Sequence, residues 1–451
     1  MKYGQKRLLT LREKVLCTLF ILLLFRLLAH VPLPFVNPEY ISSLLDTNGS
    51  LTFFNALTGG GFESMSLMAL GITPYISASI IIQLLGVVIP RLADMQKEGA
   101  TGRKMIERIS ICLAVVLALV QSLCMTWGYG KSGLLTSYKW YTVLVPALLM
   151  TVGVFLLAFA GQMITKHFFG NGTSLILLAG ILSSYFGDAN MLYEVITSGK
   201  KLPVAVVLCV VALIAIVLLF WFTFYLNQCE KRISVTYSQK MAVNGGSHVQ
   251  TSVIPLKLIP GSVVPIIFAS SIITLPALVQ SFTGTDVKWL WLFNSAKWFQ
   301  KTAWWASFGA LLYCLMIIGF SYYYNSLNLN EIEMANNLKK HGGFVHGIRP
   351  GKPTSDYIKK QMRYMTFIGA LGLCVIAIVP NVITNVLGIS RLSFLGTSII
   401  ITVSVICETK KKFLTDYQTR NLYMSRMSGS SKTQVRSRSV FGNGFQREGR
   451  K

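Results

Sequence analysis

The sequence predicts an all-α polytopic membrane protein with ten transmembrane helices in two related halves. Hydrophobic residues make up 53% of the chain and charged residues only 13%. The apolar residues form long blocks, not amphipathic stripes, and ~20 such residues cross a ~30 Å hydrocarbon core as a helix. Ten blocks are expected as spans: residues 15–31, 67–90, 109–127, 141–164, 174–186, 203–226, 263–279, 303–323, 365–386 and 394–406.

The first block follows a basic segment, residues 1–14, as the apolar part of a secretory signal peptide would. It has no small-residue cleavage site, and it runs directly into Pro32 and Pro34. A cleaved leader ends in small residues. We therefore expect a retained first span.

The net charge of +25 could indicate a nucleic-acid partner, but the positions of the basic residues indicate a membrane. With the N-terminus inside, 33 of the 42 Lys and Arg residues fall on the cytoplasmic side, 11 of them in the tail. Eight fall in outer loops, and Arg26 lies inside the first span. This asymmetry follows the positive-inside rule, so both termini are expected in the cytoplasm.

The second span is preceded and interrupted by residues that break a helix. Residues 59–85 open with three glycines and then carry Gly71 and Pro74. Interrupted backbone at membrane depth persists only where it is buried in protein or lines a water-filled cavity. This stretch therefore predicts part of a pathway and not a plain anchor.

An internal repeat relates the two halves of the chain. Residues 74–79 (PYISAS) match residues 265–270 (PIIFAS), and Gly-Thr-Ser opens the short fifth span at 172–174 and the tenth at 396–398. An offset of five spans reverses direction across the membrane, so the repeat is inverted. Short or broken spans at corresponding positions predict the working site.

Two long cytoplasmic loops, residues 227–261 and 326–363, are too specifically composed to be simple connectors. The tail, residues 409–451, is basic and rich in serine, which is typical of disorder or of binding to the membrane surface.

The chain lacks the groups that enzymes and ion-coupled transporters use. None of its 17 acidic residues falls in the middle of a continuous span. The five histidines show no metal-binding spacing, the eight cysteines form no C-x-x-C pair, and residues 347–352 (GIRPGK) lack the spacing of a phosphate loop. We expect no catalytic residue, no metal site and no cofactor, and an energy source outside the chain.

A mostly aliphatic constriction is expected where the broken spans converge. Ile72 and Ile76 lie one helical turn apart, as do Thr173 and Leu177. Together with Ile267 and Ile401 they could form a ring that resists wetting and ion leak while remaining deformable. On periodicity alone, ordinary lipid-facing or core isoleucines are the better interpretation.

Several motifs in order resemble the bacterial SecY family, the central subunits of the Sec protein translocon. They are ALGITPYISASIIIQLL, KEGATGRKMIERIS, GNGTSLILLAGI, PLKLIPGSVVPIIFASSI, NNLKKHGGFVHGIRPGKPT and LSFLGTS. The resemblance runs from about residue 12 to residue 412 and implies a protein-conducting channel, not an enzyme. It also implies two inverted five-helix halves, residues 15–186 and 204–408, joined by an outer hinge loop at 187–203 and closed around a central pore.

The resemblance assigns site residues by their place in these motifs. The pore ring would be Ile72, Ile76, Thr173, Leu177, Ile267 and Ile401. A plug at about residues 51–66 would include Phe53, Phe54, Gly59, Gly60, Gly61 and Glu63. The lateral gate would carry Ser79, Gln83, Ser270 and Ser271, for which helix packing is an equally good role. Partner docking would use Arg349, Arg232 and Lys352, although an exposed solvated arginine is the simpler reading.

The implied partners are SecE and SecG, the SecA motor ATPase or a ribosome, polypeptides bearing signal sequences, and lipid of the bacterial cytoplasmic membrane. Three departures from the family pattern leave room for an accessory SecY devoted to few substrates. Thr173 replaces the usual isoleucine, FLGTS replaces FGGTS, and CEKRISVTYSQK is a diverged docking loop. The alternatives from other classes are a secondary transporter of a small solute, which usually needs a mid-membrane carboxylate, and a recruiting scaffold, which leaves the repeat unexplained.

Overall fold

The computed structural model describes residues 11–47, 55–168, 170–197, 202–243, 246–259, 264–283, 292–293, 298, 307–328, 331–387, 398–415 and 418. The helices of the N-terminal half are α1 (Leu11–Leu28), α2 (Pro38–Thr47), α4 (Thr73–Val88), α5 (Pro90–Lys97), α6 (Ala100–Tyr129), α7 (Trp140–His167) and α8 (Gly172–Thr197), with a π-helical turn at Gly130–Leu134. The second half contains α9 (Leu202–Gln228), β1 (Glu230–Val243), β2 (Gly246–Lys257), α10 (Val264–Thr283), α11 (Phe308–Asn328), α12 (Glu331–Lys340), β3 (Gly343–Val345) and α13 (Lys352–Leu387). A last helix covers residues 398–415.

Each of the ten expected spans coincides with one of these helices. Within the described residues, four stretches are long and apolar enough to cross a membrane alone: Lys104–Tyr129, Trp140–His167, Phe308–Lys340 and Lys352–Val382. The helix pair α4 and α5, bent by 109°, would make a fifth. Shorter apolar helices occupy Gly172–Tyr185, Ile214–Gln228 and Val264–Ile273. The chain is thus a multi-pass, predominantly helical membrane protein.

Several helix boundaries differ from those expected, and two of the differences concern the second and fifth spans. The second span starts at Thr73 and not at residue 67, because Gly71 takes a φ of 55° and Pro74 sits in the first helical turn, where its missing N–H costs nothing. The fifth span does not stop at residue 186: α8 continues to Thr197, so the expected hinge loop 187–203 is mostly helix. The apolar block marked a possible membrane crossing, whereas the helix-forming residues that follow it extend the helix.

The loop expected at residues 227–261 is largely a β-hairpin, which the sequence reasoning missed. β1 pairs with β2 in antiparallel fashion from Glu230↔Lys257 to Val243↔Gly246, and β1 also pairs with β3 through Val235↔Val345. The sequence did carry a signal, because Ile233, Val235 and Tyr237 alternate and Asn-Gly at 244–245 is a strong hairpin dipeptide. The sheet unites the two expected cytoplasmic loops.

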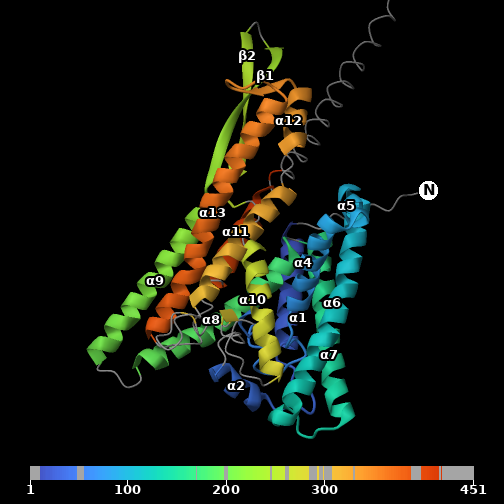
Figure 1. The fold of residues 1–451 in the computed structure, drawn as a ribbon, viewed down its shortest axis with the longest axis vertical. Coiled ribbons are helices and arrows are strands. Elements are labelled where there is room, and N and C mark those ends of the chain that lie inside the picture. The colour runs from blue at the N-terminus through green and yellow to red at the C-terminus, as the bar shows by residue number, and fades with distance from the viewer. Residues whose placement is uncertain are drawn as a thin grey trace, which may run out of the picture.

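Three apolar cores organise the molecule. The largest lies among α1, α4, α8, α10, α11, α13 and the last helix. A second core packs α2 and the segment before α4 against α6 and α7. The third lies between the sheet, α12 and the start of α13. Figure 1 shows β1, β2 and α12 at one end of the molecule and α2 at the other.

Candidate functional site

The four segments that the internal repeat singled out converge in the largest apolar core. Ile72 at the start of α4, Leu177 on α8, Ile267 on α10 and Ile401 on the last helix belong to this one cluster, and all are buried. Ile76 is partly buried and packs against the same cluster. These five side chains offer only aliphatic carbon, so the part of the core that they form can exclude water and ions without binding them.

Thr173 lies at the edge of this arrangement. Its side chain is half-buried, and its hydroxyl donates to Oδ1 of Asn171 at 3.0 Å. The methyl carbon of Thr173 faces Gly161 of α7. A Cβ added to Gly161 would lie 3.3 Å from this methyl carbon. The hydroxyl of Thr173 therefore has its hydrogen-bond partner at the start of α8, and Thr173 does not belong to the apolar cluster.

The segment immediately before α4, residues 55–72, begins with one helical turn at 55–58, is otherwise irregular and is mostly buried. It covers the described part of the expected plug. Asn55 makes two hydrogen bonds to Glu63. Its side chain accepts from the Glu63 N–H at 3.1 Å and donates to the Glu63 carboxylate at 2.9 Å. Thr58 Oγ1 accepts from the N–H of Phe62 at 3.1 Å. Phe53 and Phe54 lie outside the described residues. The segment satisfies many of its own polar groups, as a buried backbone without regular structure must.

The same segment is also joined to the chain that follows α1. The N–H of Leu33 donates to the carbonyl of Met65 at 3.0 Å, and the N–H of Leu67 donates to the carbonyl of Val31 at 3.0 Å. Glycines at 59 and 60 take φ values of 67° and 86°, and Met65 takes 42°. Such left-handed backbone turns the chain back on itself and is easiest for glycine.

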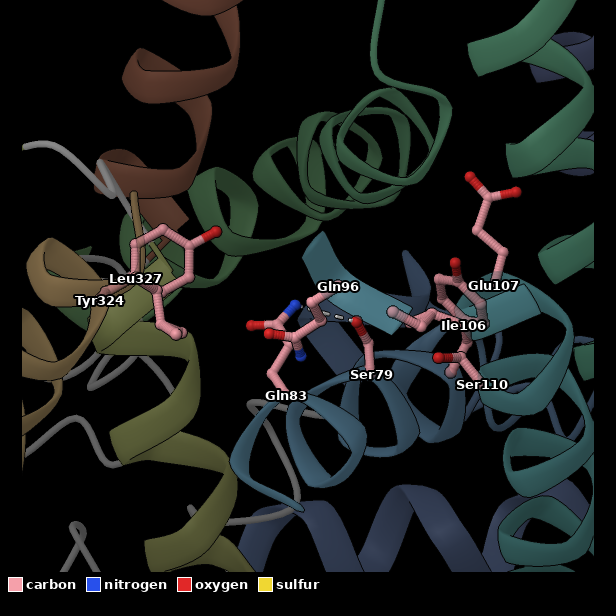
Figure 2. A pocket seen from close by; sticks show the side chains of 9 residues that line it. Ser79, Gln83, Gln96, Ile106, Glu107, Ser110, Tyr324 and Leu327 are labelled. Atoms are coloured by element: carbon pink, nitrogen blue, oxygen red, sulfur yellow. Dashed lines mark hydrogen bonds between the residues drawn. The ribbon is translucent and has the colours of Figure 1, made fainter. Parts of the chain in front are cut away.

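A pocket of about 390 Å³ lies beside the expected lateral gate, and Figure 2 shows its lining. Ser79 and Gln83 on α4 line it and bond to each other, with Gln83 Nε2 donating to Ser79 Oγ at 3.3 Å. Tyr324 and Leu327 of α11 face them from the other half. The remaining lining residues are Tyr75, Gln96, Ile106, Glu107 and Ser110.

The two halves also meet through a hydrogen bond beside this pocket. The hydroxyl of Tyr323 on α11 donates to the main-chain carbonyl of Gln83 at 2.9 Å. The sequence reasoning missed this residue, although a run of three tyrosines closing an apolar block was a visible signal.

The expected gate serines on α10 lie outside this pocket. The hydroxyl of Ser270 donates to the carbonyl of Ile267 in its own helix at 3.0 Å, and Ser271 is half-buried. Neither residue lines the pocket. Their neighbour Phe268 makes edge contacts with Phe320 and Tyr324, which fasten α10 to α11.

The expected docking residues are exposed on the module formed by the sheet, α12 and the start of α13. Arg349 lies in a tight turn between two glycines of positive φ, Gly347 at 77° and Gly351 at 108°. Thr354 Oγ1 donates to the carbonyl of Arg349 at 2.8 Å and fixes that turn. Lys352 is exposed at the first position of α13.

Arg232 is exposed on β1, where it pairs with Glu230 at 3.1 Å. Because β1 pairs with β3, the two basic loops form one surface. A rigidly displayed guanidinium suits recognition of a partner's carboxylates or phosphates. Within the described part of the chain, no group of three or more His, Cys, Asp and Glu residues could hold a metal ion.

Comparison with known proteins connects these features. A family model for SecY matches residues 66–410. The "Protein translocase subunit SecY" of Bacillus licheniformis is 35% identical over 422 residues, covering 91% of this chain and 95% of the relative. That of Bacillus subtilis strain 168 is 34% identical over 418 residues, covering 91% and 95%.

Solved structures share the fold at lower identity. One described as "The structure of a protein conducting channel" is similar with a TM-score of 0.65 and 17% identity, covering 90% of this chain and 93% of the other. Another, "Sec61 in the Canine ribosome-channel complex from the endoplasmic reticulum", has a TM-score of 0.62 and 15% identity, with the same coverage.

Proposed function

The chain belongs to the SecY family, and we propose that it conducts unfolded secretory polypeptides across the bacterial cytoplasmic membrane and releases membrane segments sideways into lipid. It is a protein-conducting channel subunit, not an enzyme. One observation carries the proposed mechanism: the four broken or short segments of the two halves meet in a single apolar cluster, beside a buried irregular segment.

In this proposal Ile72, Ile76, Leu177, Ile267 and Ile401 form the pore ring, with Thr173 at its margin. Aliphatic side chains cannot replace the hydration shell of an ion, so the ring seals against small ions. They also have no fixed geometry to match, so the ring can deform around polypeptides of any sequence. Residues 55–66 close the outer side of this ring as the plug.

The lateral gate lies between α4 and the pair α10 and α11. The Tyr323 hydroxyl crosses this boundary with a hydrogen bond to the carbonyl of Gln83, and water or a passing segment could replace that bond. The bond between Gln83 and Ser79 lies within α4 and need not break when the gate parts. Such a boundary can part at low cost, because an exchanged hydrogen bond changes the net free energy by only about 1 kcal/mol. Ser270 and Ser271 contribute packing on the other side of the gate.

The basic module would dock a motor ATPase such as SecA, or a ribosome, on the cytoplasmic face through Arg349, Arg232 and Lys352. Support comes from the exposure of these side chains and from the rigid turn around Arg349. Solved relatives of this fold include channels described as ribosome-bound. SecE and SecG are the proposed membrane partners, and both termini are placed in the cytoplasm.

A narrower version of the function is an accessory SecY for few substrates. Thr173 in place of isoleucine supports it, and so does the extra bulk of the leucine at position 395 in FLGTS. An accessory channel would transport one class of precursor and fail to complement loss of a general channel.

Crosslinking to a stalled secretory precursor tests the proposed function. Single cysteines at Ser79 and Ser270 are placed on either side of the gate, and a third at Arg108, exposed on α6, is the matched control. We expect adducts from the first two sites and none from the third. Absence of adducts at both gate sites, with the complex intact, would favour a small-solute transporter.

A further inference from the structure

Arg26 is a guanidinium in the last turn of a membrane-spanning helix, and the ring, gate and docking assignments give it no role. It lies beside Phe25 and Ala29, both buried, while Leu23 and Leu27 of the same helix are exposed. The guanidinium is therefore directed to the protein side of α1 and not to lipid. A charged group at such a position is costly unless it has partners.

Its partners lie on two other elements. Arg26 Nη1 donates to the main-chain carbonyl of Gly59 in the plug segment at 3.0 Å, and Nη2 donates to the hydroxyl of Ser183 on α8. An arginine that merely extended towards water at the membrane surface would not bridge two protein groups. The planar fork of the guanidinium joins α1, the plug segment and α8 at one point.

A face of α8 completes this junction. Ser184, next to Ser183, donates through its hydroxyl to the carbonyl of Ala56 at 3.2 Å. One turn earlier, Gly180 lets the backbones touch: a Cβ there would lie 2.6 Å from the carbonyl oxygen of Leu57. A Cβ at Gly59 would lie 2.4 Å from Arg26 Nη1 and 2.8 Å from the Gly180 oxygen.

We propose that Arg26, with Gly180, Ser183 and Ser184 of α8, forms a latch that holds the plug segment in its seat and sets how often the channel is closed. The proposal rests on the proposed function, because it names the regulation of the same channel. The plug segment offers the latch only main-chain groups, Ala56 O and Gly59 O.

These bonds are all lost together when the segment leaves. Arg26 then keeps only the Ser183 hydroxyl among these partners, which leaves a cation with fewer protein acceptors and favours return of the segment. The donors of the latch are neutral hydroxyls and one guanidinium, and they form hydrogen bonds, not covalent bonds. The latch therefore holds the segment reversibly. Arg26 acts on transport through the plug segment and is thus a positioning residue.

The test measures how fast a membrane-impermeant maleimide labels a Ser64→Cys variant in reconstituted bilayers, quantified on the peptide that contains residue 64. Ser64 is half-buried in the seated segment, and its hydroxyl donates to Gly60 O at 3.1 Å. We expect Arg26→Met to raise the labelling rate about tenfold, because hydrogen bonds to a charged group are the stronger kind. Arg12→Met, on the exposed first turn of α1, is the matched control and should leave the rate unchanged.

Ser183→Ala should raise the rate about threefold, and the double variant should equal Arg26→Met alone, because both changes remove the same bridge. A wild-type rate in Arg26→Met, or fully multiplicative effects of the two changes, would overturn the latch. If Arg26→Met does not insert into the membrane, the labelling rates of Ser183→Ala and Arg26→Lys test the latch instead. Wild-type labelling rates in both of these variants would overturn the latch. Precursor transport by the unchanged complex is measured separately, so failure of the channel function would not be confused with failure of the latch.

Discussion

The two halves of the chain insert very different structures at the same place in their repeat. Before α4, the N-terminal half inserts residues 55–72, which are irregular, rich in glycine and buried. Before α10, the C-terminal half inserts the hairpin of β1 and β2, which carries exposed charge. Both inserts lead into a helix with proline in its first turn, Pro74 and Pro265.

The physical difference between the inserts suits opposite tasks. The first insert bonds to itself, to α1 and to α8, and its glycines allow backbones to approach closely. The second has an antiparallel ladder, with one register shift between Tyr237 and Met241, and a small core of its own that includes Val235. It therefore keeps its shape while projecting from the membrane region. Under the proposed function, the first insert would seal the channel and the second would recruit a partner, while the helices around them keep the repeat.

The largest expected effect breaks recruitment and leaves the seal intact. Arg349→Glu should lower motor-driven or ribosome-driven transport about thirtyfold, because central interface arginines often contribute about 2 kcal/mol or more to binding. Initial rates of precursor translocation into proteoliposomes measure this. Lys104→Glu, the same charge change on exposed α6, should cost less than twofold. An equal loss of transport in the two variants would mean that Arg349 acts only through the net charge of the protein and not as a specific docking residue.

The next largest effect is expected from a change that weakens the seal against ions and leaves partner recruitment unchanged. Gly59→Ala should raise resting ion conductance about tenfold, because the added Cβ meets Arg26 and the Gly180 backbone and the left-handed φ of 67° adds strain. Gly60→Ala is the matched control, since it shares the strain at a φ of 86° but meets nothing within 4 Å. Planar-bilayer recordings compare the two. Identical leaks would mean that strain alone unseats the segment.

The smallest expected effect is a leak caused by changes in the proposed pore ring, to which both halves contribute side chains. Ile76→Gly and Ile267→Gly should each raise the leak about threefold, since each change removes aliphatic bulk from one side of a constriction that still has other members. The same recordings measure both. A leak equal to wild type in both variants would contradict their assignment to the ring. Leu23→Gly, at an exposed position on α1, controls for the loss of helix propensity.

The sequence was sufficient for the helices and for the convergence of the broken segments. Each of the ten apolar blocks overlaps a helix of the structure, because hydropathy acts locally and strongly. The repeat paired the segments around Pro74 and Pro265, and the structure places the neighbouring Ile72 and Ile267 in the same apolar core. The family resemblance to SecY was also confirmed.

Features that depend on contacts between distant residues could not be predicted in this way. The alternation in β1 was readable, but its pairing with β3 joins residues more than a hundred positions apart. Arg26 and Tyr323 each donate to a main-chain carbonyl, of Gly59 and of Gln83, and such acceptors leave no mark on the sequence. The continuation of α8 past residue 186 was missed because the end of an apolar block was taken for the end of a helix.

The length of α13 has a mechanical consequence. This helix of 36 residues begins at Lys352, contributes Ile358 to the core of the docking module, and contributes Ile376 to the core around the ring. At 1.5 Å per residue it is a rod about 54 Å long, so a tilt of about 5° at one end shifts the other by about 5 Å. Figure 1 shows the rod running from the sheet into the membrane bundle. If the proposed ring and docking surface hold, a partner that pushes on the module would act on the ring through this helix, and mechanical work done outside the membrane would reach the constriction without any chemical signal.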